Sequence, residues 1–332
     1  MKWKSAIAII VIIVLILFVQ YLLPKTTGRP VQSDSSALPD SVGIVGYINT
    51  PPVNVSSFRG KVVLVDFWTY SCINCQRTLP YIQGWWEKYK DSGLVVLGMH
   101  TPEFEFEKIL SNVERAVAKF GLTYPVLLDS NYATWNAFSN RYWPHKFLLD
   151  STGKIRYDHI GEGGYEETER VIQELLAELP RSHVNKSSLL APNASIPGLI
   201  GTPELYLGYA FQRGQLGNSE GWQPEKSVNY QFPLQLRPNM FYLGGMWHNN
   251  PDNMQAVANA TLVLGYTSSK VFMVAGADGE SSISVILDGM QRQNMSVQHE
   301  ELYTLVNQEE SGNHVLILKI SPGVRVFTFT FG

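Results

Sequence analysis

A pair of cysteines at the junction between a buried strand and a helix constrains this chain more than any other feature. Cys72 and Cys75 are its only cysteines, and two residues separate them. Residues 62–67 form an apolar run interrupted only by Asp66, which predicts a buried parallel strand. Over residues 79–89, apolar side chains recur every three to four positions, as in an amphipathic helix. The sequence therefore places a Cys-x-x-Cys motif at a strand-to-helix turn of an α/β domain.

This position suits the first cysteine to attack a disulfide. Unpaired N–H groups and the positive end of the helix dipole stabilise a thiolate at a helix N-terminus. A second thiol within reach can then resolve the mixed disulfide. We therefore predict Cys72 as the nucleophile and Cys75 as the resolving thiol, with the redox-active Cys72–Cys75 disulfide in place of any cofactor.

Two other uses of a cysteine pair fit the sequence less well. Tetrahedral zinc needs two further Cys or His ligands, whereas the chain has no other cysteine and no closely spaced pair of histidines. A purely structural disulfide would close too small a loop to stabilise the fold much. Thiol-disulfide chemistry is therefore the favoured interpretation.

Residues 1–24 predict a membrane anchor. Lys2 and Lys4 precede an apolar run over residues 6–19 that continues almost unbroken to a proline, and roughly 18 helical residues span about 27 Å. Bulky residues before that proline favour an uncleaved anchor over a signal peptide. The lysines place the N-terminal end in the cytoplasm, so the rest of the chain is expected outside it, periplasmic or extracellular. Residues 25–43, rich in Ser, Thr, Pro and Gly, are expected to form a linker.

The length that follows the anchor, about 300 residues, suggests two domains. We expect an α/β domain over residues 44–180, a linker over 181–200 and an all-β sandwich or jelly roll over 201–332. The formal net charge is −3 and no basic block stands out beyond the anchor, which argues against a nucleic-acid partner.

A second predicted strand brings further polar residues to the edge of the sheet that carries Cys72. Residues 94–100 are apolar, and the carboxyl ends of neighbouring parallel strands lie along one edge. Glu103 or His100 could there relay protons to the thiols, and Glu103 could contact a substrate. The pattern of residues 104–120 predicts the next helix, and a capping role for Thr101 and Glu103 at its start fits the same sequence.

Residues 45–180 resemble the thioredoxin superfamily, and the WTYSCINCxxTLPY and HTPEFEFE segments resemble its TlpA-like branch and the thioredoxin domain of DipZ-type proteins. The resemblance implies that Asp66 is the buried acid that assists the resolving cysteine and that Pro80 kinks the helix. It also implies that Pro144 is a cis-proline facing the disulfide, where it and Trp143 would bind the substrate. The Ile-Asn dipeptide between the cysteines replaces the Gly-Pro of thioredoxin, so no redox potential is implied.

The second predicted domain has several strand-like runs separated by turn signals, among them residues 261–264 and 271–274. Its TPELYLGYA and FTFTFG segments resemble the C-terminal domain of DipZ-type proteins, which is likened to carbohydrate-binding modules. Sugar binding would use exposed aromatic platforms, for which Trp222 and Trp247 are candidates beside the amides of Asn249 and Asn250. Aromatic residues of a β-sandwich also belong to its core, so a protein-docking or spacer role fits this domain as well.

These features predict a membrane-anchored, extracytoplasmic thiol-disulfide oxidoreductase that reduces protein disulfides. DipZ-type proteins carry a polytopic electron-transferring region, and one anchor replaces it here, so the resemblance implies a separate membrane thiol donor. One alternative is a redoxin-type thiol peroxidase, although Thr69 lacks the preceding proline that such sites carry. The other is a cell-surface protein that binds glycans or partners and has an accessory redox domain.

Overall fold

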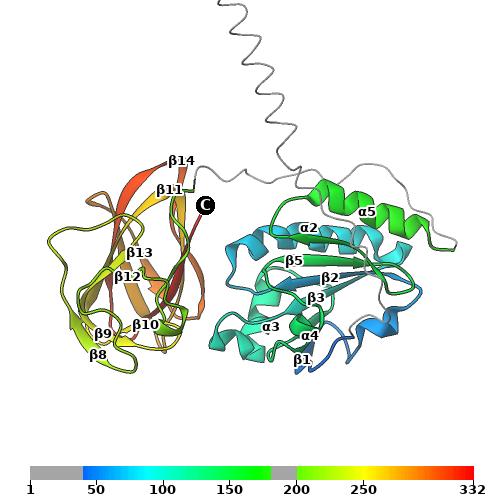
Figure 1. The fold of residues 1–332 in the computed structure, drawn as a ribbon, viewed down its shortest axis with the longest axis horizontal. Helices are drawn as coiled ribbons and strands as arrows, with labels where there is room; N and C mark the ends of the chain where they lie inside the picture. Colours follow the sequence, from blue (N-terminus) through cyan, green and yellow to red (C-terminus); the bar gives the residue numbers. More distant parts are fainter. Residues whose placement is uncertain (1–39, 181–199) are drawn as a thin grey trace, which may run out of the picture.

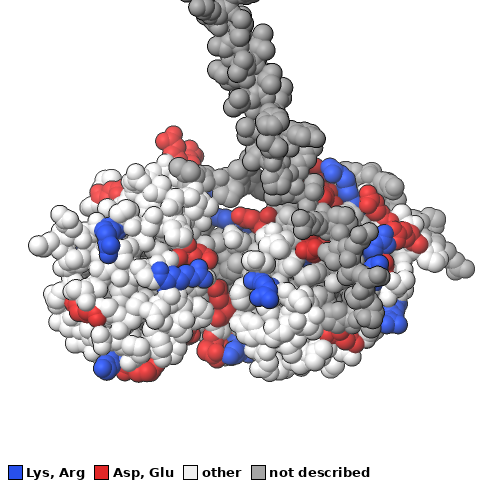
Figure 2. All heavy atoms as spheres, viewed as in Figure 1, with Lys and Arg blue, Asp and Glu red and all other residues white. Residues whose placement is uncertain are grey.

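The computed structural model describes residues 40–180 and 200–332, which form two domains side by side (Figure 1). The predicted anchor lies outside the described residues, as do nearly all residues of both predicted linkers. Within the described ranges, no helix is long and apolar enough to cross a membrane. On the face drawn in Figure 2, acidic and basic side chains are scattered between large uncharged areas of both domains.

The first domain is built on a six-stranded sheet in the order β1-β4-β3-β2-β5-β6. Its central parallel strands are β2 (Val62–Trp68), β3 (Leu94–His100) and β4 (Val126–Leu128). The remaining strands are antiparallel to their neighbours in the sheet. They are β1 (Gly46–Ile48), β5 (His145–Leu149) and β6 (Ile155–Ile160). All residues of β2 are buried, as expected for a strand covered on both faces.

Helices cover both faces of this sheet. One buried cluster joins it to α2 (Ile73–Tyr89), α3 (Leu110–Lys119) and α5 (Tyr165–Ala177), and another joins it to the short helices α4 (Ala133–Ala137) and η1 (Val55–Phe58). Side chains alternate along β2, and its even-numbered apolar residues belong to the first cluster. Asp66 is even-numbered, so its carboxyl points to the α2 side of the sheet.

The segment after β3 differs from the sequence prediction. The pattern of residues 104–120 predicts one helix, but the structure has a 3-10 turn, η3 (Glu105–Lys108), followed by α3. Ile109 lies between them with an extended backbone, at φ −79° and ψ 114°. This break interrupts the helix and leaves Phe104 and Phe106 buried in the same cluster as residues of the second domain. A second 3-10 turn, η2 (Lys90–Ser92), ends α2.

The second domain consists of strands and one 3-10 turn, η4 (Tyr209–Phe211), within its described residues, which confirms the all-β prediction. Its strands are β7 (Leu205–Tyr206), β8 (Ser227–Tyr230), β9 (Phe241–Asn249), β10 (Met254–Ala256), β11 (Ala260–Gly276), β12 (Ser281–Leu287), β13 (Met290–Val297), β14 (Glu301–Ile320) and β15 (Arg325–Phe331). All pair antiparallel, and the pairs β9–β10, β10–β15, β15–β11 and β11–β9 form a ring. The sheet thus curls around one core, and the finer assignment as a jelly roll stays a prediction.

The two domains share a buried contact. Tyr206, Val274 and Phe327 of the second domain belong to the same apolar cluster as the residues of α2, α3 and η3 in the first. An ion pair at the rim joins Lys119 Nζ to Glu301 Oε2 at 2.5 Å. The all-β domain, which the sequence predicts to be a β-sandwich, therefore packs directly against the side of the α/β domain that carries α2 and α3.

Candidate active site

The two cysteines lie at the N-terminus of α2, as the sequence predicts. Cys72 is the N-cap residue and partly exposed, whereas Cys75 lies in the first turn and is fully buried. Both are free thiols in this structure, and the Cys75 backbone N–H donates a hydrogen bond to Cys72 Sγ at 3.4 Å. Such a hydrogen bond and the positive end of the helix stabilise negative charge on Cys72. The arrangement therefore gives one accessible sulfur for attack and one sheltered sulfur behind it.

Asp66 lies beneath this pair with no exposed surface. Neither of its carboxyl oxygens has a hydrogen-bond partner among the described residues. Burial raises the pKa of the Asp66 carboxyl to about 7, and the positive charge of Lys146 opposes that rise. A carboxyl with a pKa near 7 can exchange a proton at physiological pH, which suits a general acid or base.

Lys146 is the residue that sequence reasoning missed. It stands opposite Asp66 in the antiparallel register of β2 and β5, it is fully buried, and its Nζ donates to the Gly161 carbonyl at 3.1 Å. Burial lowers the pKa of its ammonium, while the charges of Asp66 and Cys75 act in the opposite direction. The signal in the sequence is a lysine inside an otherwise apolar strand, HKFLL.

The resolving thiol needs a base. Burial raises the pKa of Cys75 well above its ordinary value, and Cys72 and Asp66 raise it further. Cys75 is therefore protonated until it attacks, and its proton must go to a neighbouring group. Asp66 is the acid whose charge acts on Cys75, on the same side of the sheet.

Trp143 and Pro144 immediately precede β5. The Trp143–Pro144 peptide bond is cis, as the family resemblance implies. The Trp143 indole N–H donates to the Thr101 carbonyl at 3.0 Å, and its ring packs 4.2 Å from that of Trp135. Trp143 stays partly exposed and borders the same cluster as Cys72. A role of both residues in substrate binding stays a prediction.

His100 packs against two aromatic rings at the end of β3. It is buried at the end of β3, and burial lowers the pKa of its imidazole to about 3. Its ring stacks on Tyr70 at 5.7 Å and meets Trp68 edge-on at 5.1 Å. Its Nε2 lies 3.4 Å from the Thr69 hydroxyl, and a proton relay through His100 stays a prediction.

Glu107, and not Glu103, caps the 3-10 turn that follows β3. The Glu103 carboxyl accepts the Tyr206 hydroxyl at 2.6 Å, and burial raises its pKa to about 8. The capping acid is Glu107, which accepts the backbone N–H groups of Glu103 and Phe104 at 2.6 and 3.0 Å. Glu103 thus faces the second domain through its carboxyl, and substrate binding by Glu103 stays a prediction.

Comparison with known proteins assigns each domain to a family. Residues 35–176 match the redoxin family, and residues 202–332 match the thioredoxin-like C-terminal domain family. The chain belongs to the redoxin family of thioredoxin-like proteins. This agrees with the resemblance of the Cys72–Cys75 segment to the thioredoxin superfamily.

Relatives of this redoxin share one or both of its domains. The protein DipZ of Mycobacterium tuberculosis (strain CDC 1551 / Oshkosh) is 39% identical over 306 residues, which cover 89% of this chain but 42% of DipZ. The thiol-disulfide oxidoreductase YkuV of Bacillus subtilis is 28% identical, over 42% of this chain and 95% of YkuV. The thiol-disulfide oxidoreductase ResA of Geobacillus kaustophilus is 30% identical, over 36% of this chain and 67% of ResA. The chain thus spans less than half the length of DipZ, and the match to DipZ extends over both domains.

In the C-terminal domain of this redoxin, the two tryptophans proposed as sugar platforms are packed inward. Trp247 is fully buried, and its indole N–H donates to the Gly244 carbonyl at 3.2 Å. Trp222 is partly buried against the core, 5.9 Å from Phe241. A fully buried indole has no free face for a sugar, which corrects the expectation at Trp247, whereas the role of Trp222 stays a prediction.

Proposed function

We propose that this chain is a membrane-anchored, extracytoplasmic thiol-disulfide oxidoreductase that reduces disulfides in proteins. The observation that carries the proposal is the partly exposed Cys72 at the N-terminus of α2, with Cys75 buried behind it on the side of the sheet that carries Asp66. The names of YkuV and ResA as thiol-disulfide oxidoreductases support it. The apolar run at the N-terminus of the sequence supports the anchor.

The reaction follows from the exposure of the two sulfurs. The Cys72 thiolate attacks one sulfur of a substrate disulfide, forms a mixed disulfide and releases the other substrate sulfur as a thiolate. Asp66 then accepts the proton of Cys75, whose sulfur attacks Cys72 Sγ and releases the second substrate sulfur. The reaction leaves a disulfide between Cys72 and Cys75, and two electrons have passed to the substrate. A separate thiol donor in the membrane would then reduce the Cys72–Cys75 disulfide back to two thiols.

The direction of electron flow is tested by the reduction potential of the Cys72–Cys75 pair. The detergent-solubilised chain is equilibrated in graded dithiothreitol or glutathione buffers, and the fraction of disulfide is measured by thiol alkylation and mass spectrometry. A potential near that of thioredoxin, about −270 mV, is expected for a reductase. A potential near −120 mV would make the protein an oxidant of folding proteins and would sink the proposed direction.

A redoxin-type thiol peroxidase is the competing enzyme. The buried resolving thiol next to Asp66 favours disulfide exchange, because a peroxidatic site needs to activate only the attacking sulfur and a peroxide. Consumption of hydrogen peroxide by the reduced chain, compared with reduction of a protein disulfide such as that of insulin, separates the two functions. Turnover of peroxide much faster than of insulin would favour the peroxidase.

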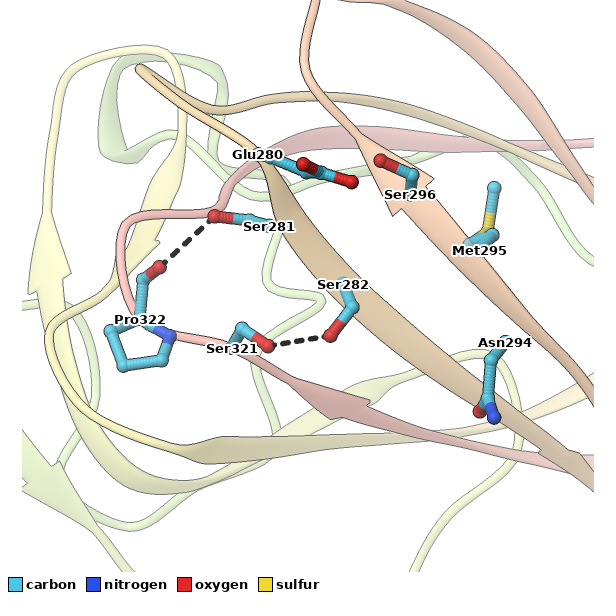
Figure 3. Close-up of a pocket in the computed structure, with 8 residues that line it drawn as sticks. All are labelled: Glu280, Ser281, Ser282, Asn294, Met295, Ser296, Ser321 and Pro322. Carbon is cyan, nitrogen blue, oxygen red and sulfur yellow. Dashed lines mark hydrogen bonds between the residues drawn. The ribbon is translucent and has the colours of Figure 1, made fainter.

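A hollow on the β-sandwich favours a second function, glycan binding. It has a volume of about 510 Å³, and the hydroxyls of its lining residues Ser282 and Ser321 point toward each other at 2.9 Å (Figure 3). Hydroxyl, amide and carboxylate groups are suited to the hydroxyls of a sugar. Its lining residues are Glu280, Ser281, Ser282, Asn294, Met295, Ser296, Ser321 and Pro322. Binding of the chain to a glycan array that Ser282→Leu abolishes and Cys72→Ser preserves would support this function, and no binding by the wild-type chain would reject it.

A further inference from the structure

The contact between the two domains lies on the segment that follows β3. Phe327 of β15 packs its ring 5.4 Å from Phe104 and 4.7 Å from Phe106, and all three side chains are buried. The Tyr206 hydroxyl, from β7, donates to Glu103 Oε1 at 2.6 Å. The β-sandwich therefore contacts residues 103–106 through the buried ring of Phe327 and the hydrogen bond of Tyr206.

The same segment holds the residue that precedes the nucleophile. Glu107 Oε1 accepts the Ser71 hydroxyl at 2.6 Å and the Ser71 backbone N–H at 3.3 Å. Its other oxygen, Oε2, accepts the N–H groups of Glu103 and Phe104. Glu107 has no exposed surface, and these four donors help to compensate the burial of its carboxyl. The Glu107 carboxyl thus ties the segment at residues 103–104 to the backbone next to Cys72.

The two sets of contacts form one connected path. From Phe327 and Tyr206 it passes through residues 103–104 to Glu107 and then to Ser71, which is bonded to Cys72. If the β-sandwich moved away, Phe104 and Phe106 would become exposed, and the donors that hold the Glu107 carboxyl would lose their fixed positions. The geometry of the residue before Cys72 therefore depends on the docked domain.

We propose that the β-sandwich is a positioning part of the dithiol site, and that Tyr206 and Phe327 act on Cys72 through Glu103, Glu107 and Ser71. The inference rests on the proposed function and adds a role for the second domain in it. Because coupling between two equilibria is reciprocal, a docked domain that favours one redox state of the cysteines is itself held more tightly in that state. The second domain thereby sets the redox equilibrium of a site to which it contributes no reacting atom.

The test is Tyr206→Phe in the full chain, which removes one hydroxyl and keeps the ring. We expect the equilibrium constant of the Cys72–Cys75 pair with glutathione to change at least threefold, which is about 14 mV for two electrons. We also expect the Ser71 amide proton to exchange faster with solvent, since its acceptor is less firmly held. Tyr209→Phe is the matched control, because the Tyr209 hydroxyl donates at 2.7 Å to Glu225 within the β-sandwich. The control should leave both quantities at the wild-type values.

A double-mutant cycle gives a second test of the proposal, which does not depend on the Tyr206→Phe variant alone. If Glu107→Gln and Tyr206→Phe act along one path, their effects on the redox equilibrium constant are not independent. The fold-change in the double variant is then smaller than the product of the two fold-changes in the single variants. Phe327→Leu, which keeps an apolar contact, serves as a second variant on the β-sandwich side. A lower unfolding temperature of Tyr206→Phe with an unchanged equilibrium constant and unchanged Ser71 exchange would overturn the inference, because the contact would then be merely structural. Failure of the wild-type chain to form any Cys72–Cys75 disulfide would instead overturn the proposed function as well.

Discussion

Asp66 of β2 and Lys146 of β5 stand opposite each other in the sheet, and both are fully buried on the side that carries Cys75. The neighbour of Asp66 in the parallel register is Gly98 of β3, which has no side chain. Lys146 is therefore the charged group that faces Asp66 from an adjacent strand. Burying two charged groups contributes little to stability on balance, because the cost of desolvation offsets their attraction. The burial of Asp66 and Lys146 is better explained by proton transfer, because Cys75 must lose a proton when it attacks.

The first prediction concerns Asp66→Asn and stability. The Asp66 carboxyl has a pKa of about 7 in the folded chain and its ordinary value of 3.8 when unfolded. The folded state thus holds this proton more tightly, and stability falls as pH rises from about 4 through 7. Between pH 5 and pH 8 the wild-type protein should lose about 2–3 kcal/mol from this group, whereas asparagine does not titrate. Denaturant unfolding of both proteins at the two pH values measures the difference.

The control for this measurement is Asp91→Asn. Asp91 is exposed in the 3-10 turn after α2, so its replacement should leave the pH dependence of unfolding as in the wild type. Equal pH dependence in the wild type and Asp66→Asn would mean that Asp66 does not titrate in this range, and its role as a base would be lost.

The second prediction concerns Lys146→Met and the pH dependence of resolution. The positive charge of Lys146 lowers the pKa of Asp66, so its removal should raise that pKa above about 7. The rate of resolution of a mixed disulfide at Cys72 should then rise with pH at a higher midpoint than in the wild type, since Asp66 must be ionised to accept a proton. Stopped-flow release of a chromophoric thiol from the mixed disulfide gives this rate. Lys154→Met, on the exposed turn before β6, is the control and should keep the wild-type midpoint.

The positions of Asp66 and the cysteines follow from the sequence because each depends on local pattern. A buried strand and an amphipathic helix fix where the motif lies, and the fold of the first domain follows from the order of such elements. Lys146 did not follow, because its importance comes from a register across two strands that are about 80 residues apart in the chain. The residue is visible in the sequence, but its partner is set by the tertiary fold.

The β-sandwich shows the same limit on a larger scale. The sequence predicts separate strands over residues 261–264 and 271–274, but β11 is one strand from Ala260 to Gly276. Its polar middle, residues 267–270, stays extended because it pairs with β14 across a bulge, a contact that no local pattern reveals. Likewise, nothing local predicts that Phe104 and Phe106 face another domain, because their contacts with Phe327 are set by the tertiary fold.

The third prediction separates the roles of the two sulfurs. Cys75→Ser should accumulate mixed disulfides with protein substrates, because Cys72 is accessible for attack and no thiol remains to resolve the product. Cys72→Ser should form none, because Cys75 has no exposed surface. Non-reducing gels after incubation with a disulfide-containing protein give the result. Equal trapping by both variants would show that Cys75 is reached from solvent and would reverse the assignment.

The fourth prediction tests how closely the groups beneath the dithiol are packed. A methyl group at Gly98 would lie 2.8 Å from the Tyr124 ring and 3.0 Å from the Trp68 indole nitrogen, and both rings are fully buried. Since buried rings cannot move aside freely, Gly98→Ala should destabilise the chain by about 1–3 kcal/mol. Gly279→Ala, where nothing lies within 4 Å, is the matched control and should change unfolding by no more than about 0.5 kcal/mol. If Gly98→Ala unfolded at the same denaturant concentration as the control, the Tyr124 and Trp68 rings would have to be mobile. Mobile rings beside Asp66 would rule out a fixed route for the Cys75 proton.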